Sequence, residues 1–341
     1  MDVPVPLARY RRDVDAFLRL FLNREGCSQL YRMARYHMGW EDQDGRPSDQ
    51  PGKGLRPALL LLACEAAGGD WRRALPAAAA VELVHNFSLI HDDIQDRDTE
   101  RHHRPTVWKV WGNSQGINAG DALMALSRLA LLRLHDEGVP PDVVIDAARI
   151  LDERTLEMVE GQVMDLAFEG TDDIDLAGYL SMIEKKTGAL FDCSLSLGAL
   201  VAGGDRELAQ SMGHAGRLLG IAFQIRDDML GIWGAESRTG KEPAADIRRH
   251  KKSLPIVFAL AGEDHEAAAI VKRALQQSEL SDADVSIVLR VLDSIGAQRY
   301  CSALGDERKR EALEVLEALP LVEERAAELR ETAEFLLARD F

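Results

Sequence analysis

Helical periodicity recurs along almost the whole chain and limits the fold more than any other feature of the sequence. Apolar residues such as Phe17, Leu20 and Phe21 are spaced three and four positions apart, which places them on one face of a helix. From residue 74 to about residue 90 the chain is apolar nearly all round, as in a helix buried within a bundle. Alternating patterns typical of strands are scarce. We therefore predict an all-α protein.

The breaks between helical stretches do not divide the chain into domains. They fall at residues 41–57, 101–106 and 234–255 and are rich in Gly, Pro or charged residues. None is long enough, or sufficiently like a linker, to mark a boundary. A length of 341 residues would allow two domains, but we predict a single helical domain covering residues 1–341, with a core that needs no disulfides.

Charge and cysteine usage exclude several classes of function. The chain has 41 Lys and Arg against 57 Asp and Glu, a net charge of −16, which argues against non-specific binding to nucleic acid or an anionic membrane. No apolar stretch is long enough to span a bilayer, and the start does not resemble a signal peptide. We expect a cytoplasmic protein with no nucleic-acid partner and no membrane anchor. The scattered cysteines are interpreted as buried thiols, neither disulfides nor zinc ligands: Cys27, Cys64, Cys193 and Cys301.

The strongest local signal is a cluster of aspartates at the end of the long apolar segment. Asp92, Asp93 and Asp96 lie within five positions, and Asp92 and Asp96 are one helical turn apart, so their carboxylates share a face. Like charges at the end of a buried segment need a cation. Mg²⁺ takes oxygen ligands and bridges carboxylates to phosphate oxygens. The alternative is a solvated acidic helix end.

A second aspartate pair, Asp227 and Asp228, follows the apolar run 218–225. Taken alone, it is equally consistent with a pair on the surface. Two such pairs, each at the end of an apolar helix, are much less expected by chance. Facing each other across a bundle, they would form a site for several metal ions that is open to a diphosphate.

Basic residues that could bind a diphosphate lie near both clusters. Lys53 and Arg56 lie in a loop bounded by Gly and Pro that enters a helix, whose first amides can contribute to an anion site. Arg101 follows the first cluster, where it could bind phosphate bidentately. For the loop residues, solvated surface positions are the alternative.

Further lysines lie later in the chain. Lys186 and Thr187 precede a glycine, and Lys241 and Lys251 lie in the longest polar loop. That loop is interpreted as a lid that closes when phosphate and metal neutralise its charge. An exposed basic loop, and an exposed Lys-Thr pair, are the alternatives.

Together these segments resemble the trans-isoprenyl diphosphate synthases, the polyprenyl synthetase family. The resemblance covers most of the chain from Lys53 to Pro255 in the family's order, and residues 227–234, DDMLGIWG, are most similar to bacterial geranylgeranyl diphosphate synthases. It implies a single large helical bundle of the isoprenoid synthase type with a central cavity. The matched segments are GKGLRP, HNFSLIHDDIQD, RHHRPT, GQVMDL, EKKTGALF, FQIRDD and TGKEPAADIRRHKKSLP.

The resemblance also implies an activity, a metal requirement and a role for each matched residue. The reaction is head-to-tail condensation of an allylic diphosphate with isopentenyl diphosphate in a homodimer, with more than one Mg²⁺ ion per site. The implied metal ligands are Asp92, Asp93, Asp96, Asp227 and Asp228. The same five residues and Lys186 are the implied catalytic residues. The implied residues for the allylic diphosphate are Arg101, Asp165, Lys186, Thr187, Gln224 and Lys241. Those for isopentenyl diphosphate are Lys53, Arg56, His85 and His102, and Lys251 belongs to the lid.

The chemistry of the implied reaction agrees with these residue types. Its hard step is the loss of diphosphate from an allylic carbon, which leaves a carbocation. Metal ions and cationic side chains stabilise the leaving charge, and a closed apolar site excludes water. No side-chain nucleophile is needed.

Two positions depart from the family's pattern. Gly231 stands where the second aspartate motif often has a third acid, and His102 stands where a second arginine usually follows Arg101. A histidine is mostly neutral near pH 7 and cannot form the same fork. The site then works with Lys53, Arg56 and His103 or Arg104, or it binds isopentenyl diphosphate weakly, or it no longer needs that substrate.

Two other functions stay open. One is a terpene synthase on the same scaffold, which ionises a finished prenyl diphosphate and which His102 and Gly231 would allow. The other, of a different class, is a non-catalytic partner subunit of a prenyl synthase, against which the retained aspartates, Lys53, Arg56 and Arg101 argue.

Product length is indicated by the residues before the first aspartate motif. Phe87 and Ser88 lie five and four positions before Asp92. One bulky ring beside a small residue resembles enzymes that stop at geranylgeranyl diphosphate, C20. The alternative is that Phe87 is an ordinary core residue.

Overall fold

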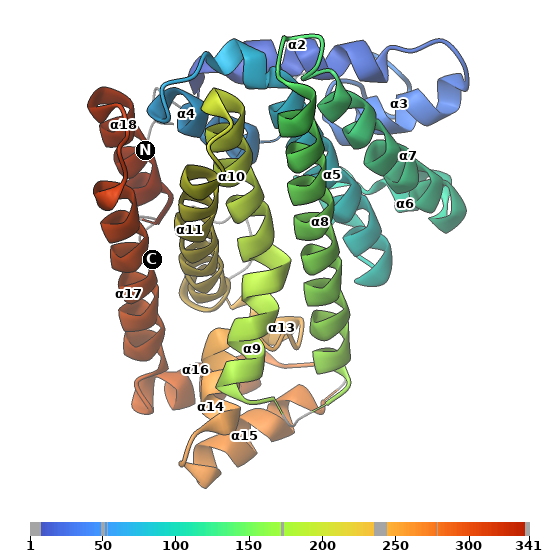
Figure 1. Cartoon of the computed structure of the whole chain (residues 1–341). Helices are drawn as coiled ribbons and strands as arrows, with labels where there is room; N and C mark the ends of the chain where they lie inside the picture. The colour runs from blue at the N-terminus through green and yellow to red at the C-terminus, as the bar shows by residue number, and fades with distance from the viewer. Residues whose placement is uncertain are drawn as a thin grey trace. The chain divides into compact units, whose positions relative to one another are not determined.

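The structure is a computed structural model that describes residues 8–48, 52, 54–171, 174–234, 244–277 and 279–337. Helices make up nearly all of the regular structure in these residues, which confirms the predicted all-α fold (Figure 1). In chain order they are α2 (Arg11–Leu22), α3 (Ser28–His37), α4 (Leu55–Ala66), α5 (Leu75–Gln95), α6 (Val107–Trp111), α7 (Asn113–Leu132), α8 (Pro141–Glu169), α9 (Leu176–Ile183), α10 (Ala189–Gly203), α11 (Arg206–Trp233), α13 (Ala245–Arg248), α14 (Leu254–Ala261), α15 (His265–Leu275), α16 (Asp282–Ser294), α17 (Ala297–Ala318) and α18 (Glu323–Leu337).

Three short elements interrupt this pattern, and the first two matter for the site. A hairpin of β1 (Glu100–Arg101) and β2 (Arg104–Pro105) pairs its strands antiparallel, with Arg101 opposite Arg104. A π-helical turn, η2 (Glu184–Gly188), joins α9 to α10. A short 3₁₀ helix, η1 (Trp71–Ala74), precedes α5.

Contacts group the chain into two compact units. Unit 1 consists of Met1–Glu153, Cys193–Met212 and Pro320–Leu329, and unit 2 of Arg154–Asp192, Gly213–Leu319 and Arg330–Phe341. The single domain over residues 1–341 therefore stays a prediction.

The core of unit 1 is built around α5, which is buried along most of its length. Pro76 lies in its first turn, where the missing N–H costs nothing. Helix α7 approaches α5 through glycines, because a Cβ at Gly120 would overlap the ring of His91, and one at Gly116 would lie 2.8 Å from Ile94 Cδ1. The end of α5, where the aspartates lie, is thereby held against α7.

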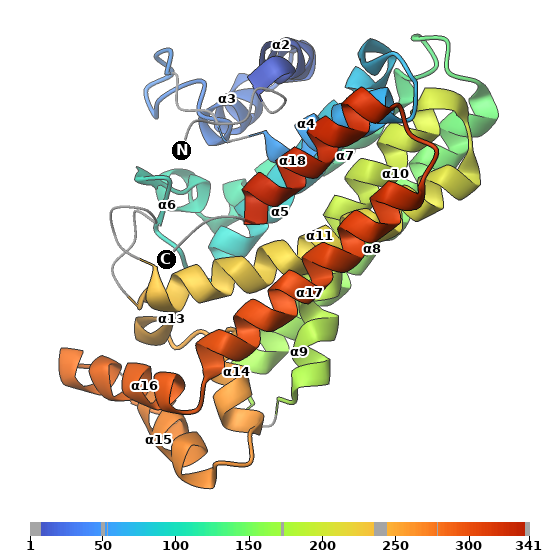
Figure 2. The same ribbon diagram turned by 90° about the vertical axis from the view of Figure 1, so that its left-hand side faces the viewer.

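Unit 2 has two apolar clusters. One joins α9, α11, α14 and α17 through residues that include Tyr179, Ile225 and Leu254. The other lies among α13, α14, α15, α16 and the start of α17, and Figure 2 shows α14, α15 and α16 gathered at one end of this unit. The first cluster supports the part of α11 that carries Asp227 and Asp228.

Cysteines and helix lengths add two findings. All four cysteines are free thiols: Cys64, Cys193 and Cys301 are buried as predicted, but Cys27 is exposed just before α3. None of the helices in the described residues combines the length and the apolar character that crossing a membrane requires.

Candidate functional site

The first carboxylate cluster occupies the last turn of α5. Asp92 and Asp93 lie within the helix, and Asp96 caps it, donating its backbone N–H to the carbonyl oxygen of Asp92 at 2.8 Å. Asp92 is half-buried and Asp96 is exposed, whereas Asp93 is only 1% exposed. The cluster thus has two aspartates that solvent reaches and one that lies inside unit 1.

The buried aspartate is held by the arginine that follows the cluster. Arg101 places its Nε 2.8 Å and its Nη2 2.7 Å from Asp93 Oδ1. Burial raises the pKa of Asp93, and Arg101 opposes that shift. The second oxygen, Oδ2, is buried and has no hydrogen-bond partner among the described residues. An orphaned carboxylate oxygen beside two accessible carboxylates fits a hard divalent cation.

Metal ligands are not preassembled in the residues that the structure describes. No group of three or more acidic, histidine or cysteine side chains is arranged there to hold a metal ion. Mg²⁺ does not need such a group, because it usually keeps several water ligands and binds through one or two carboxylates plus substrate phosphates.

The second carboxylate cluster, on α11, has a different environment. Asp227 is exposed, whereas Asp228 is fully buried. Asp228 accepts a hydrogen bond from the hydroxyl of Tyr179, one from Gln224 Nε2 at 3.0 Å and one from the backbone N–H of Leu254 at 3.1 Å. Burial raises the pKa of Asp228 to about 6. Asp228 therefore ties α11 to α9 and α14, and Asp227 is the member that solvent reaches.

The glycine that departs from the family's pattern makes room for another carboxylate. A Cβ on Gly231 would lie 2.7 Å from Oδ1 of Asp246 and closer still to the rest of that carboxylate. Asp246 lies on α13 and is 6% exposed. The space of a side chain at position 231 is thus filled by an acid from α13, which the sequence reasoning missed although it lies within the last matched segment.

Lys251 lies close to the second cluster. Its backbone N–H donates to the carbonyl oxygen of Asp246 at 2.9 Å. Desolvation lowers the pKa of Lys251, but the nearby carboxylates, chiefly Asp246, Asp228 and Asp227, outweigh it and raise the pKa above its ordinary value. The residue remains exposed, so its positive charge is available to an anion near these carboxylates. Lys241, the other predicted lysine of this loop, lies outside the described residues.

The π turn brings together the residues predicted for the allylic diphosphate in unit 2. Lys186 Nζ lies 2.5 Å from Asp165 Oδ2 on α8. Thr187 donates its hydroxyl to Gln224 Oε1 at 2.8 Å, and Gln224 donates in turn to Asp228. Three segments that are far apart in the sequence, from α8, the π turn and α11, thus meet through the side chains of adjacent residues of the turn.

A group of cationic and imidazole side chains lies in unit 1. Arg56 Nη1 is 3.1 Å from His85 Nε2. Burial lowers the pKa of His85 well below its ordinary value, and the charges of Arg56 and Arg101 lower it further. His85 is therefore a neutral imidazole beside a guanidinium, and can accept a hydrogen bond from it or donate to an anion. Lys53, predicted for the same substrate, lies outside the described residues.

His102 belongs to the turn of the hairpin. His102 and His103 have φ angles of 51° and 59°, so they form the tight turn that places Arg101 opposite Arg104. Arg104 stacks on Tyr36, with its Cζ 4.2 Å from the ring centroid, and donates from Nη2 to the carbonyl oxygen of Glu41. Arg104 thereby anchors the hairpin.

His37, at the end of α3, is a residue that the sequence reasoning missed. Burial lowers its pKa to about 3, with contributions from the charges of Arg101 and Arg104 and from His102. These interactions place His37 among the cationic residues of unit 1. The only sequence feature that could have pointed to His37 is its position shortly before the predicted break at residues 41–57.

The predicted chain-length residues lie on α5. Phe87 is 4% exposed and meets His91 edge-on, with ring centroids 5.7 Å apart. Ser88 donates its hydroxyl to the carbonyl oxygen of His85 at 2.8 Å. Phe87 thus lies five positions before Asp92, with its ring packed against a neighbour on the same helix.

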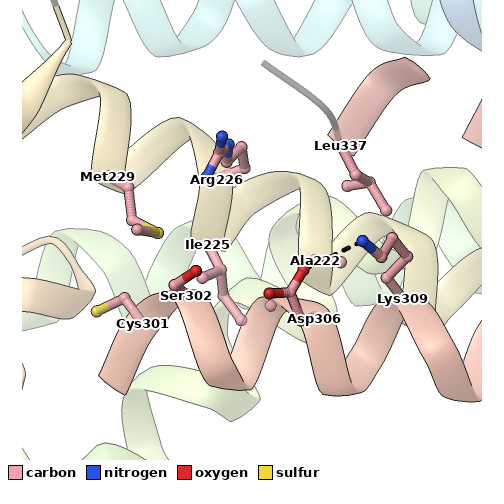
Figure 3. A pocket seen from close by; sticks show the side chains of 10 residues that line it. Ala222, Ile225, Arg226, Met229, Cys301, Ser302, Asp306, Lys309 and Leu337 are labelled. Atoms are coloured by element: carbon pink, nitrogen blue, oxygen red, sulfur yellow. Dashed lines mark hydrogen bonds and ion pairs between the residues drawn. The ribbon is translucent and has the colours of Figure 1, made fainter. Parts of the chain in front are cut away.

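A small cavity between α11 and α17 lies outside this group of residues (Figure 3). Its volume of about 20 Å³ is room for one water molecule. Arg226, Asp306 and Lys309 line it together with apolar residues, and Asp306 pairs with Lys309 at 3.1 Å. None of the predicted site residues lines this cavity.

Comparisons with known proteins give consistent results. A family model described as polyprenyl synthetase matches residues 47–292. A (2E,6E)-farnesyl diphosphate synthase of Mycobacterium tuberculosis is 39% identical over 308 residues, which are 89% of this chain and 84% of the relative. A geranylgeranyl diphosphate synthase of the same organism is 38% identical over 288 residues, 84% of this chain and 81% of the relative.

Solved structures agree. The crystal structure of a polyprenyl synthetase from Streptomyces coelicolor has a TM-score of 0.93 and 35% identity, covering 99% of this chain and all of the other. A geranylgeranyl pyrophosphate synthase from Corynebacterium glutamicum, crystallised with isoprenyl diphosphate and magnesium, has a TM-score of 0.83 and 25% identity over the full length of both chains.

Proposed function

Because the chain belongs to the polyprenyl synthetase family, we propose that it condenses isopentenyl diphosphate with an allylic diphosphate and releases a short-chain prenyl diphosphate. The observation that carries the proposal is the hydrogen-bonded group in unit 2. There Asp165, Lys186, Thr187, Gln224 and Asp228 come together from three matched segments.

The aspartates have two roles: most of them bind the metal ion, and Asp228 holds its helix in place. In unit 1 solvent reaches Asp92 and Asp96, and Asp93 Oδ2 has no hydrogen-bond partner among the described residues. In unit 2 solvent reaches Asp227. When bound by these carboxylates, Mg²⁺ supplies Lewis-acid stabilisation of the leaving diphosphate. Asp228 keeps α11 in place through its three donors.

The cationic residues bind the two diphosphates. Lys186 and Arg101 are each paired with an aspartate, which orients the cation but leaves donors for phosphate oxygens. In unit 1, Arg56 with its neutral partner His85 binds isopentenyl diphosphate, and His102 adds only a weak donor. Because a histidine stands in place of an arginine at position 102, we expect a higher KM for isopentenyl diphosphate than an arginine there would give.

We propose geranylgeranyl diphosphate, C20, as the main product, with Phe87 as the floor under the growing chain. The support is the single bulky ring five positions before the first aspartate, next to Ser88. The M. tuberculosis relatives include both a farnesyl and a geranylgeranyl synthase, so the assay of product length is needed.

A homodimer and a cytoplasmic location complete the proposal. Exposed apolar residues at helical spacing on α8, Leu156, Val159 and Val163, support a face that a second copy of the chain covers. The cytoplasmic location stays a prediction from the sequence.

The test is a product assay with purified protein, Mg²⁺ and farnesyl diphosphate, with and without isopentenyl diphosphate. We expect a C20 diphosphate only when both substrates are present, and longer products from Phe87→Ala. A hydrocarbon or alcohol formed from farnesyl diphosphate alone would identify a terpene synthase and overturn the proposal.

A further inference from the structure

The π turn η2 carries both Lys186 and Thr187 and is met by α8 without any side chain in between. The residue of α8 at this contact is Gly161. A Cβ added to Gly161 would lie 2.7 Å from Lys186 Cα and 2.9 Å from the carbonyl carbon of Lys185, and closer still to the backbone nitrogen of Lys186. A real Cβ does not fit at these distances, so the backbones of α8 and the π turn touch directly.

Ion pairs flank this backbone contact along α8. Lys185 Nζ pairs with Glu160 Oε2 at 2.6 Å, and Lys186 Nζ pairs with Asp165 Oδ2 at 2.5 Å. Glu160 immediately precedes Gly161, and Asp165 follows it by one helical turn. Two consecutive lysines of the π turn are therefore tied to α8 on either side of the glycine.

A second glycine contact holds the same turn against α11. A Cβ on Gly220 would lie 2.7 Å from Gly188 Cα. One turn later on α11, Gln224 accepts a hydrogen bond from the hydroxyl of Thr187. A π turn has one residue more than an α-helical turn and is less stable than a regular helix, which is why such turns are retained mostly at functional sites. Here the close approach of two helices fixes its shape.

We propose that Gly161 is a positioning residue for Lys186. Because it has no side chain, α8 lies directly on the π turn, and this contact sets where the Lys186 ammonium group stands relative to Asp165. The inference rests on the proposed function, in which Lys186 binds the allylic diphosphate, and it adds a residue that itself touches no substrate.

The test is Gly161→Ala, compared with Gly203→Ala as the matched control. Gly203 ends α10 and has no atom within 4 Å of an added Cβ, so we expect that variant to keep the wild-type kinetics. For Gly161→Ala we expect the KM for farnesyl diphosphate to rise roughly tenfold, while the KM for isopentenyl diphosphate changes by less than about twofold. A purely structural role would lower the active fraction and leave both KM values unchanged.

A double-mutant cycle separates positioning of Lys186 from other effects. In a Lys186→Ala background the ammonium group is already gone, so Gly161→Ala should change the affinity for a non-cleavable farnesyl thiodiphosphate by less than about twofold. If the two substitutions instead multiply their effects, Gly161 does not act through Lys186, and the proposal is wrong.

Failure of Gly161→Ala to fold would not end the test. Glu160→Gln weakens the exposed pair with Lys185 on the same contact and should raise the KM for farnesyl diphosphate about two- to threefold. An unchanged ratio of the two KM values would contradict the proposal. The affinities for farnesyl thiodiphosphate, unlike the KM values, need no turnover. Wild-type protein that forms no prenyl diphosphate would therefore refute the proposed function, while the affinities in the double-mutant cycle would still test the role of Gly161.

Discussion

The two aspartate clusters share a sequence pattern but hold their buried members by different interactions. Asp93 is bound through one oxygen by a charged partner, Arg101, and its other oxygen has no partner among the described residues. Asp228 is bound through both oxygens by neutral donors, which are Tyr179, Gln224 and the amide of Leu254.

These two sets of partners suit the two clusters to different roles. A charged partner favours the ionised carboxylate, and the remaining oxygen of Asp93 can still turn to a metal ion. Deep burial raises the pKa of Asp228 to about 6, and three neutral donors occupy its two oxygens. The first cluster is therefore suited to binding a metal ion. In the second cluster Asp227 is accessible to a metal ion, whereas Asp228 holds α11 against its neighbours.

The largest expected effect separates the accessible aspartates from the buried ones. Asp92→Ala removes a carboxylate that solvent reaches, and we expect kcat to fall roughly a thousandfold, about 4 kcal/mol. Because Asp92 is half-buried and takes no part in the core, the free energy of unfolding should stay within about 1 kcal/mol of the wild-type value. Steady-state kinetics and urea unfolding check both parts, and a variant that keeps a tenth of its activity would contradict them.

Next in size is the loss of the charged pair in the first cluster. Asp93→Asn leaves Arg101 without its anion, and we expect the free energy of unfolding to fall by about 2–4 kcal/mol. Asp228→Asn keeps the shape and one acceptor for the neutral donors, so it should cost less, about 1–2 kcal/mol at pH 5. Urea unfolding of the two variants side by side measures the difference, and equal losses would remove the distinction between the clusters.

The pH dependence sharpens the same comparison. The pKa of Asp228 in the folded protein, about 6, lies above its ordinary value of 3.8. Between these values the folded protein binds more protons than the unfolded chain, so this group lowers the free energy of unfolding as the pH rises through that range. The contribution amounts to at most about 3 kcal/mol.

Asp228→Asn should abolish this contribution, so the stability of the variant relative to wild type should improve from pH 4 to pH 7. The measurement is urea unfolding in EDTA across that range. Asp93→Asn, whose arginine partner opposes the effect of burial on the pKa, should show the weaker dependence. A wild-type profile parallel to that of Asp228→Asn would show that Asp228 does not titrate there.

The smallest expected effect concerns the space beside the second cluster. Gly231→Ala brings a methyl group into the carboxylate of Asp246, and we expect the free energy of unfolding to fall by about 1 kcal/mol. Adding Asp246→Gly should recover part of that loss, because it removes the carboxylate that collides. Gly203→Ala serves as the control, and equal stability of Gly203→Ala and Gly231→Ala would mean that Asp246 moves aside freely.

Much of the fold and part of the site followed from residue patterns. Periodicity predicted the helices because a bundle needs an apolar face on each of them, and the spacing of Asp92 and Asp96 predicted two carboxylates at one helix end. Asp246, Tyr179 and His37 were missed, because each reaches its place through tertiary packing that no local pattern records. The π turn was missed for the same reason: its shape depends on two glycines of other helices.

The most direct test of the proposal that Asp92 and Asp227 both take part in the Mg²⁺-dependent binding of an allylic diphosphate is calorimetric binding of farnesyl thiodiphosphate. We expect Mg²⁺ to strengthen binding to the wild type at least about a hundredfold over EDTA, and Asp92→Ala and Asp227→Ala each to lose most of that gain. If either variant keeps the full effect of Mg²⁺, that aspartate takes no part in the binding, and the proposal is wrong.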